Sequence, residues 1–185
     1  MATKALLSID DDPQILAIIR NVALELGYQA EMTSNAGKFM TAYSRIHPRV
    51  ITVDIQNLHQ LAASNPLWKR YVTDFIGSST DPDIVARIAQ LAKGKKVLVA
   101  LDSDHSMAHV LKELALYSPM VSKGSYLIVE DTHMDGVPTA PAFGPGPMAA
   151  VRKFLEDGGD KLFEQDVTRE AYIMTFNPGG WLRRK

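Results

Sequence analysis

Short apolar runs alternate with segments of helical periodicity from the start of the chain. Residues 5–9, 50–55 and 96–101 are apolar runs of strand length. Between the first two runs, residues such as Ile15, Ile18 and Val22 recur at the three- or four-residue spacing of a buried helix face. Strands that alternate with helices form a mostly parallel sheet covered on both faces, so this order predicts an α/β fold.

The same pattern places elements along the whole chain. It predicts helices near 12–27, 36–46, 58–64, 81–94, 105–117 and 147–156, and strands near 5–9, 29–33, 50–55, 71–76, 96–101 and 126–129. Two last strands, near 162–167 and 171–176, are close enough to pair antiparallel, and the Pro- and Gly-rich residues 133–147 should form a long loop. We therefore expect a doubly wound, mostly parallel Rossmann- or flavodoxin-like three-layer sandwich with a C-terminal antiparallel strand pair. No linker interrupts residues 1–185, which predicts a single domain.

Asp-Pro pairs mark two of the expected helix starts, at Asp12-Pro13 and Asp81-Pro82. Aspartate can accept hydrogen bonds from the free N–H groups of a first helical turn, and proline suits the first helical position because it lacks an N–H. Gly27 and Gly94 stand where the two helices should end, since glycine readily adopts the left-handed conformation found there.

Composition excludes several kinds of site. The formal net charge is −1 and no Lys/Arg block stands out, so we expect no nucleic-acid binding; the short run Arg183-Arg184-Lys185 is typical of a solvated end. The chain has no cysteine, which excludes disulfides and thiolate chemistry. No run approaches the ~18 apolar residues of a membrane span and no signal peptide is seen, so we expect a cytoplasmic protein without a membrane partner.

Acidic residues stand at the end of one predicted strand after another. They are Asp10, Asp11 and Asp12; Asp54; Asp102 and Asp104; and Glu130 and Asp131. Ligands of open parallel sheets bind beyond the carboxyl ends of the strands, and clustered carboxylates repel each other unless a cation such as Mg²⁺ or Ca²⁺ joins them. For Asp12 and Asp104 we favour helix capping instead, whereas for Glu130 and Asp131 capping and ligand binding remain equal alternatives.

The first quarter of the chain resembles a response-regulator receiver domain. The resemblance rests on Ala5-Leu-Leu-Ser-Ile-Asp-Asp-Asp-Pro-Gln-Ile-Leu and Leu26-Gly-Tyr. It implies that Asp10 and Asp11 bind Mg²⁺ with Asp54, and that Asp54 is the phosphoacceptor. After Asp54 the resemblance ends: Asp102 stands where receivers have Ser or Thr, and Glu130-Asp131 stands in place of a Lys-Pro pair.

From about residue 50 onward the chain resembles the cephalosporin hydroxylase family, which is similar in fold to S-adenosylmethionine-dependent O-methyltransferases. The segments that carry this resemblance are Val53-Asp54-Ile55, Gly77-Ser-Ser-Thr-Asp-Pro82, Leu101-Asp-Ser-Asp-His-Ser106, Gly124-Ser-Tyr-Leu-Ile-Val-Glu-Asp-Thr132, Gly144-Pro-Gly-Pro-Met148 and Thr175-Phe-Asn-Pro-Gly-Gly180. It implies a divalent metal held by Asp102, Glu130 and Asp131, and a cofactor S-adenosylmethionine held by Asp54, with Ser78 and Ser79 near its adenine.

One feature departs from that family. Methyltransferases of this type bind the methionine end of the cofactor with a glycine-rich turn after the first strand, whereas this chain has Asp10-Asp11-Asp12-Pro13 there. Without glycine the backbone cannot approach the ligand as closely, which predicts weak cofactor binding. His105 and His109 are four residues apart on a predicted helix, a spacing that also suits a metal-binding pair. We favour their interpretation as helix-surface residues, with His105 near the site by position only.

These observations give three functional hypotheses. The first, which we expect, is an engineered or recombined chimera of a receiver-like part (1–54) and a methyltransferase-like part (50–185) whose catalysis is lost. The second is a functional metal-dependent O-methyltransferase of the cephalosporin hydroxylase type. The third is a phosphoacceptor module of two-component signalling. A small-molecule substrate of unknown identity and a homo-oligomer are further expectations.

Overall fold

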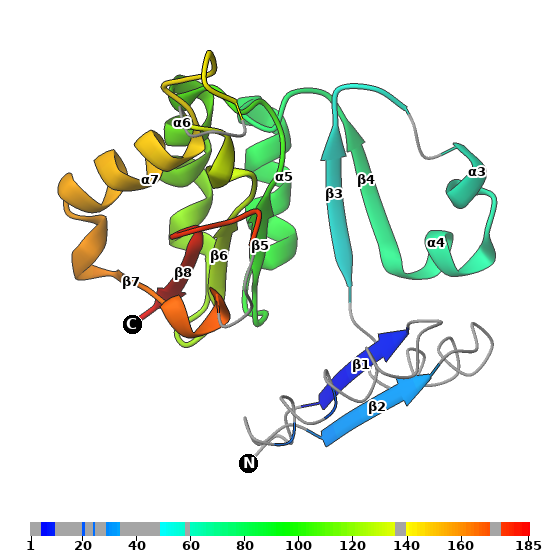
Figure 1. Cartoon of the computed structure of the whole chain (residues 1–185). Coiled ribbons are helices and arrows are strands. Elements are labelled where there is room, and N and C mark those ends of the chain that lie inside the picture. Colours follow the sequence, from blue (N-terminus) through cyan, green and yellow to red (C-terminus); the bar gives the residue numbers. More distant parts are fainter. Residues whose placement is uncertain are drawn as a thin grey trace. The chain divides into compact units, whose positions relative to one another are not determined.

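The computed structural model of the chain describes residues 5–9, 20, 24, 29–33, 49–57, 60–135, 140–170 and 175–185 (Figure 1). The chain divides into two compact units, and each is described by itself. The first unit holds residues 1–51 and 59–73, and the second holds residues 52–58 and 74–185. The expected helices near 12–27 and 36–46 lie outside the described residues. The single-domain organisation stays a prediction.

The first unit contains a parallel strand pair and two short helices. Strands β1 (Ala5–Ile9) and β2 (Gln29–Thr33) pair in parallel, with Ala5 opposite Gln29. Strands 1 and 2 are neighbours in both the Rossmann and the flavodoxin strand orders, so this pairing does not single out a receiver. Helices α3 (Gln60–Ala63) and α4 (Pro66–Tyr71) follow.

Helix α4 was not expected from the sequence. It begins at an Asn-Pro pair, where the side chain of Asn65 accepts a hydrogen bond from the N–H of Leu67 at 2.9 Å. This is the same capping chemistry as at Asp81-Pro82. The sequence did not predict this helix because the segment lies directly before the predicted strand 71–76.

Strands β3 (Val50–Asp54) and β4 (Val72–Ile76) form a two-stranded sheet. Just beyond the ends of the two strands, the N–H of Gly77 donates to the carbonyl oxygen of Asp54 at 2.8 Å. Gly77 has φ +151°, and a Cβ atom there would lie 2.7 Å from Cδ1 of Ile84. This turn therefore needs glycine, and it places the residues after β4 beside the end of β3.

The remaining elements of the second unit follow the predicted order closely. They are α5 (Pro82–Ala92), β5 (Val99–Leu101), α6 (Met107–Tyr117), β6 (Tyr126–Val129), α7 (Pro147–Glu156), β7 (Phe163–Gln165) and β8 (Trp181–Arg184). Short 3-10 turns lie at Ser118–Met120, Thr132–Met134, Gly159–Lys161 and Val167–Glu170. The Asp81 side chain accepts hydrogen bonds from the N–H groups of Asp83 and Ile84, which confirms the predicted cap of α5.

Four of these strands form a mixed sheet in the order β5-β6-β8-β7. Strand β5 is parallel to β6, and β8 is antiparallel to both β6 and β7. The predicted C-terminal antiparallel pair is thus present and the α/β class is confirmed. The last strand, however, is residues 181–184 rather than 171–176. Residues 171–174 lie outside the described part of the chain.

Arg183 and Arg184, interpreted from the sequence as part of a solvated tail, lie in this inner strand. Leu182 is fully buried and pairs opposite Leu127 of β6. The guanidinium of Arg184 lies over the ring of Phe163 at 4.9 Å from its centroid. Long basic side chains can cover apolar surface with their stems, so a strand that ends in charges can still be central.

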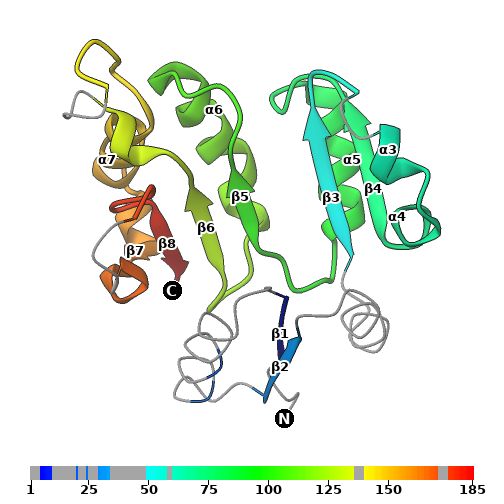
Figure 2. The same cartoon turned by 45° about the vertical axis from the view of Figure 1, so that its right-hand side comes forward.

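The core of the second unit lies between this sheet and helices α6 and α7, which pack side by side (Figures 1 and 2). Its fully buried side chains include Leu114 of α6, Val151 of α7, Leu127 of β6 and Phe163 of β7. This packing fixes the carboxyl ends of β5 and β6 relative to the first turn of α6.

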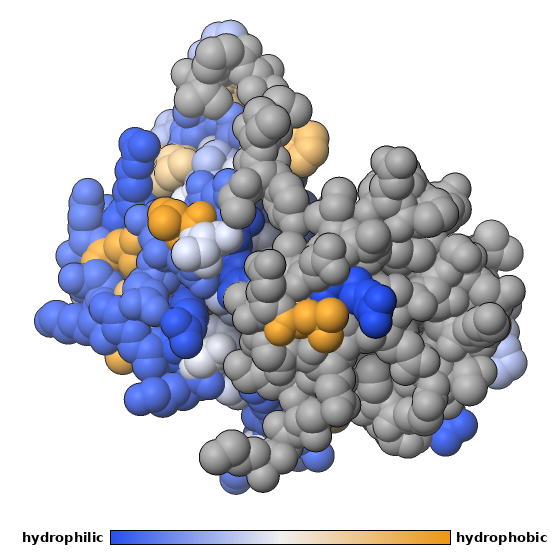
Figure 3. Space-filling model, turned by 60° about the horizontal axis from the view of Figure 1, so that its bottom comes forward, coloured by the Kyte–Doolittle hydropathy of each residue, from blue (hydrophilic) through white to orange (hydrophobic). Residues whose placement is uncertain are grey.

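On the face of the molecule that Figure 3 shows, the described residues are mainly hydrophilic, and hydrophobic ones lie in small separate patches. Scattered apolar residues of this kind are normal on protein surfaces. Among the described residues, none of the helices has the length and the apolar composition that crossing a membrane requires.

Candidate functional site

The carboxyl ends of β5 and β6 bring the predicted acidic residues together at one edge of the sheet. Asp102 follows β5, and Glu130 and Asp131 follow β6. The N–H of Glu130 donates to the carbonyl oxygen of Leu101 at 3.0 Å, so the parallel pairing continues to the last residue of β5. The position predicted from the strand ends is therefore the one that the structure shows.

His105 lies between two of these acids. Its Nε2 atom is 3.5 Å from Oδ1 of Asp102 and 3.2 Å from Oδ2 of Asp131. One ligand atom from each of the three residues lies within 4.8 Å of the others, so a single cation could contact all three. The Nε2 atom is buried and makes no aligned hydrogen bond, although it is close to both carboxylates. The interpretation of His105 as a helix-surface residue is wrong, because it precedes α6 and points at the strand ends.

The backbone of Asp131 is held in an unusual conformation. Its φ of 54° is in the left-handed region, which residues other than glycine seldom adopt. Its N–H donates to Oδ1 of Asn177 at 2.9 Å, and Nδ1 of His133 lies 3.6 Å from its Oδ1. Strained backbone of this kind concentrates at functional sites, where the surrounding structure maintains it.

The acids destabilise each other's charges. Partial burial, then repulsion by Asp102 and Asp131, raises the pKa of Glu130, and the neighbouring His105 opposes the shift only in part. A cation bound between these carboxylates would relieve that repulsion, and hard oxygen ligands suit Mg²⁺. The donor set therefore fits a divalent metal. The assignment of Asp102, Glu130 and Asp131 as its ligands stays a prediction.

Asp104 belongs to the same loop but has another role. Its Oδ1 accepts a hydrogen bond from the N–H of Ser106 at 2.8 Å, and the Ser106 side chain caps α6 by accepting from the N–H of His109. The bonds from Ser106 lower the pKa of Asp104. The cap of α6 is therefore Ser106, and the prediction that Asp104 caps this helix is wrong, because Asp104 accepts from the cap residue rather than from the first helical turn.

The predicted cofactor-binding residues lie after β3 and β4. Oδ1 of Asp54 accepts from the N–H of Gln56 at 2.9 Å, and the bond between Asp54 and Gly77 brings the loop with Ser78 and Ser79 alongside. Ser78 Oγ bonds Thr80, whereas Ser79 Oγ lies 3.0 Å from Nε2 of His109. The structure thus brings these three predicted residues to adjacent loops. Asp10 and Asp11 lie outside the described residues, so their metal role stays a prediction.

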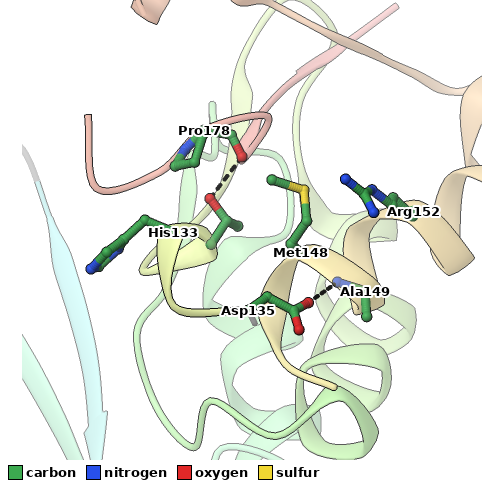
Figure 4. A pocket seen from close by; sticks show the side chains of 7 residues that line it. His133, Asp135, Met148, Ala149, Arg152 and Pro178 are labelled. Carbon is green, nitrogen blue, oxygen red and sulfur yellow. Dashed lines mark hydrogen bonds between the residues drawn. The ribbon is translucent and has the colours of Figure 1, made fainter. Parts of the chain in front are cut away.

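A pocket of about 330 Å³ lies beyond Asp131 (Figure 4). Its lining residues are Thr132, His133, Asp135, Met148, Ala149, Arg152 and Pro178. Asp135 accepts from the N–H of Ala149 and that of Gly146, which fixes the start of α7, and the Thr132 hydroxyl donates to the carbonyl of Pro178. His133 points away from the other labelled side chains, and its ring meets Phe176 edge to face.

Asn177 is a contributor to the site that sequence reasoning missed. It supports Asp131 from 46 positions further along the chain, and no local pattern reveals such a contact. His105 was expected near the site by its position, but its contacts with Asp102 and Asp131 were not predicted.

Comparisons with known proteins show what the chain is similar to. Residues 23–185 match the family model Rhamnosyl O-methyltransferase/CmcI. Proteins named rhamnosyl O-methyltransferase from Mycobacterium bovis and Mycobacterium tuberculosis are 40% identical over 139 residues, which is 74% of this chain and 56% of theirs. The protein of that name from Mycobacterium leprae is 39% identical over 142 residues, 59% of its length. The chain thus spans little more than half the length of these relatives.

Among solved structures, the MycE methyltransferase of the mycinamycin biosynthetic pathway was compared in two complexes. In complex with Mg and SAH it gives a TM-score of 0.45 at 12% identity, covering 99% of this chain and 45% of that one. In complex with Mg, SAH and mycinamycin VI it gives 0.44 at 12% identity, with the same coverage.

These findings correct the expected function. The family match begins at residue 23 and continues through the proposed join near residue 50, so it includes much of the part assigned to a receiver. The relatives are named as methyltransferases, and none of those described above is a receiver. The prediction of a chimera with lost catalysis is therefore wrong, and the methyltransferase alternative is the better supported one.

Proposed function

We propose that this chain, which belongs to the rhamnosyl O-methyltransferase/CmcI family, transfers a methyl group from S-adenosylmethionine to a hydroxyl oxygen with the help of Mg²⁺. The observation that carries the proposal is the position of His105, with Nε2 3.2 Å from Asp131 and 3.5 Å from Asp102. A proton acceptor beside a set of metal-binding carboxylates is what the deprotonation of an alcohol requires.

Asp102, Glu130 and Asp131 would hold the metal, and Asp54 with the loop of Ser78 and Ser79 would hold the cofactor. When bound, S-adenosylmethionine would supply the methyl group from its sulfonium, and Mg²⁺ would supply a Lewis acid for the acceptor oxygen. The raised pKa of Glu130 supports the metal assignment, because burial and two like charges disfavour its ionised form unless a cation is present.

His105 would accept the proton of the acceptor hydroxyl at Nε2. The deprotonated oxygen would be the acceptor of the methyl group, and the proton would stay on Nε2 until solvent removes it. Asp102 and Asp131 would keep the imidazole in place, since both carboxylates lie within 3.5 Å of the ring nitrogen.

The acceptor that we propose is a sugar hydroxyl of the rhamnosyl class. Support comes from the names of the mycobacterial relatives, which share 40% identity over 74% of this chain. The pocket beyond Asp131 is close to the acids in sequence and combines Met148 and Pro178 with polar groups, a lining that suits the mixed polar and apolar faces of a deoxysugar.

The test is a methyl-transfer assay on the full chain with S-adenosylmethionine and a rhamnosyl glycoside. We expect S-adenosylhomocysteine and methylated acceptor to form in equal amounts with Mg²⁺, and neither to form with a chelator. Asp157→Asn is the matched control, because Asp157 pairs with Lys153 at the exposed end of α7, outside the site. If titration calorimetry detects neither cofactor nor Mg²⁺ binding to the wild-type chain, the proposal is overturned.

A further inference from the structure

Glu113 is a buried carboxyl group to which the proposed chemistry assigns no role. It lies in the middle of α6, and only 2% of it is exposed. One oxygen, Oε2, is buried without a hydrogen-bond partner. Burying such a group costs free energy that an apolar residue of similar size would not cost, so packing alone does not explain glutamate at this position.

The other oxygen of Glu113 contacts the loop that follows β5. Oε1 accepts a hydrogen bond from the hydroxyl of Ser103 at 2.8 Å. Ser103 lies directly between Asp102, whose side chain is 59% exposed, and Asp104. The bond therefore attaches this loop to α6. It is a contact with the protein interior in a mostly exposed loop.

The same oxygen also faces the neighbouring loop. Nε2 of His109 is 3.6 Å from Oε1 of Glu113 and 3.0 Å from the hydroxyl of Ser79. The hydroxyl of Tyr117 donates to the carbonyl of Ser79 at 2.7 Å, and burial, with the charge of Glu113, raises the pKa of Tyr117 to about 12. Tyr117 thus stays a neutral donor. Through these contacts α6 holds both the loop with Ser79 and the loop with Ser103.

We propose that Glu113 is a positioning residue that fixes Asp102 for metal binding through the hydroxyl of Ser103. The inference rests on the proposed function, in which Asp102 is a metal ligand. An outer partner that holds a ligand typically changes metal affinity by about 10- to 100-fold when it is removed. Because Glu113 acts through a neighbouring residue rather than through the ligand itself, we expect a change near the lower value.

The test measures the Mg²⁺ dissociation constant of the full chain by titration calorimetry. Glu113→Leu removes the acceptor, and Ser103→Ala removes the donor while it leaves α6 intact. Each should weaken Mg²⁺ binding about tenfold. The double variant should be no weaker than either single one, since both remove the same bond. Glu113→Gln keeps an acceptor oxygen and should restore most of the affinity.

Ser122→Ala is the matched control. It removes a serine hydroxyl that accepts from the N–H of Val97, outside the site, and leaves the bond between Glu113 and Ser103 in place, so its Mg²⁺ affinity should equal that of the wild type. Equal affinity in the wild type, Ser103→Ala and Glu113→Leu would overturn the inference. So would additive losses in the double variant, or a loss in Ser122→Ala as large as that in Ser103→Ala.

Hydrogen exchange of the metal-free chain separates this inference from the proposed function. Amides of residues 102–106 should exchange faster in Ser103→Ala than in the wild type, while those of α7 should not change. If the wild type fails to bind Mg²⁺, the proposed function fails and the metal-positioning role of Glu113 fails with it. If the wild type binds Mg²⁺ but exchange and affinity are unchanged in Ser103→Ala, only the inference on Glu113 fails.

Discussion

The acidic residues at the two ends of β6 have environments that shift their pKa values in opposite directions. At its carboxyl end, Glu130 is next to Asp131 and near Asp102, and burial and repulsion raise its pKa. At its amino end, Tyr126 donates to Asp166 at 2.5 Å, and Arg169 contacts both of them. Burial alone would raise the pKa of Asp166, but hydrogen bonds from Thr168 and Tyr126 and the charge of Arg169 lower it.

The difference distinguishes an acid that stabilises the fold through protein partners from acids whose ionised forms are favoured by a bound cation. Asp166 has protein partners that favour its ionised form, so it contributes to stability in the chain by itself. Glu130 has Asp102 and Asp131 nearby, and His105 offsets their repulsion only in part, so its ionised form favours an added cation. Substitutions at the two ends should therefore have opposite consequences for activity and stability.

The largest effect should follow from Asp131→Asn at the carboxyl end. Loss of one negative ligand should lower methyl transfer by about 10³-fold, or about 4 kcal/mol of transition-state stabilisation. The stability of the metal-free chain should be unchanged or higher, because repulsion of Glu130 is relieved. Rate assays at saturating Mg²⁺ and denaturant unfolding of the same preparations measure both quantities. A stable variant with wild-type activity would contradict the assignment of the acids at the carboxyl end of β6 to metal binding.

A smaller effect on the rate should follow from His105→Gln. Glutamine cannot accept the proton of the acceptor, and removal of a general base lowers rates by about 10²-fold or more. Mg²⁺ binding should persist, because the carboxylates remain. Single-turnover rates, with metal affinity measured in parallel, test this division of roles. Loss of Mg²⁺ binding comparable to that of Asp131→Asn would make His105 a metal ligand instead.

The sequence predicted the carboxyl end of β6 better than the amino end. Asp102 and Glu130 could be placed because their strands are nearly continuous apolar runs, and parallel neighbours end at one edge of a sheet. Asp166 meets Tyr126 from 40 positions away, through a β8 strand that the sequence analysis placed elsewhere. The short Trp181–Arg184 run ends in charges, so its central place depends on partners that no local pattern shows.

A similar limit applied to the function. The acid-rich opening of the chain matched receivers in a few local residues, whereas the family match spreads over residues 23–185. Local resemblance of a strand and its following acids is shared by many doubly wound sheets. The elements with strong caps, such as α5 after Asp81-Pro82, were predicted because each signal is contained within one turn.

At the amino end, Asp166→Asn should lower stability by about 1.5 kcal/mol at neutral pH, since it weakens charge-assisted bonds to Tyr126 and Arg169. The folded-state pKa of Asp166 is lowered, so its contribution is present above the unfolded value near 4 and is lost as pH falls through the folded value. Urea unfolding at pH 7 and at about pH 2.5 should show the difference only at the higher pH. Methyl transfer should stay at the wild-type rate.

An equal destabilisation by Asp166→Asn at both pH values would mean that the carboxylate charge does not carry the effect. Tyr126→Phe provides the matched control, because it removes the shared hydroxyl and leaves Asp166 its bonds to Thr168. A loss of activity in either variant, with unchanged stability, would contradict the assignment of this end to the fold.

The smallest effect should follow from Asp104→Ala. This substitution tests whether an acid contributes to metal binding merely because it lies at the same edge of the sheet as Asp102 and Asp131. The partner of Asp104 is Ser106, in an exposed turn before α6, so removal of the Asp104 carboxylate should lower stability by about 0.5 kcal/mol. Mg²⁺ affinity should not change in Asp104→Ala. In Asp131→Asn, at the end of the neighbouring strand β6, it should fall. Calorimetric titration and thermal unfolding of the two variants, side by side, measure this contrast. A tenfold loss of Mg²⁺ affinity in Asp104→Ala would show that distance from the strand end, rather than hydrogen-bond partners, decides which acids bind the metal.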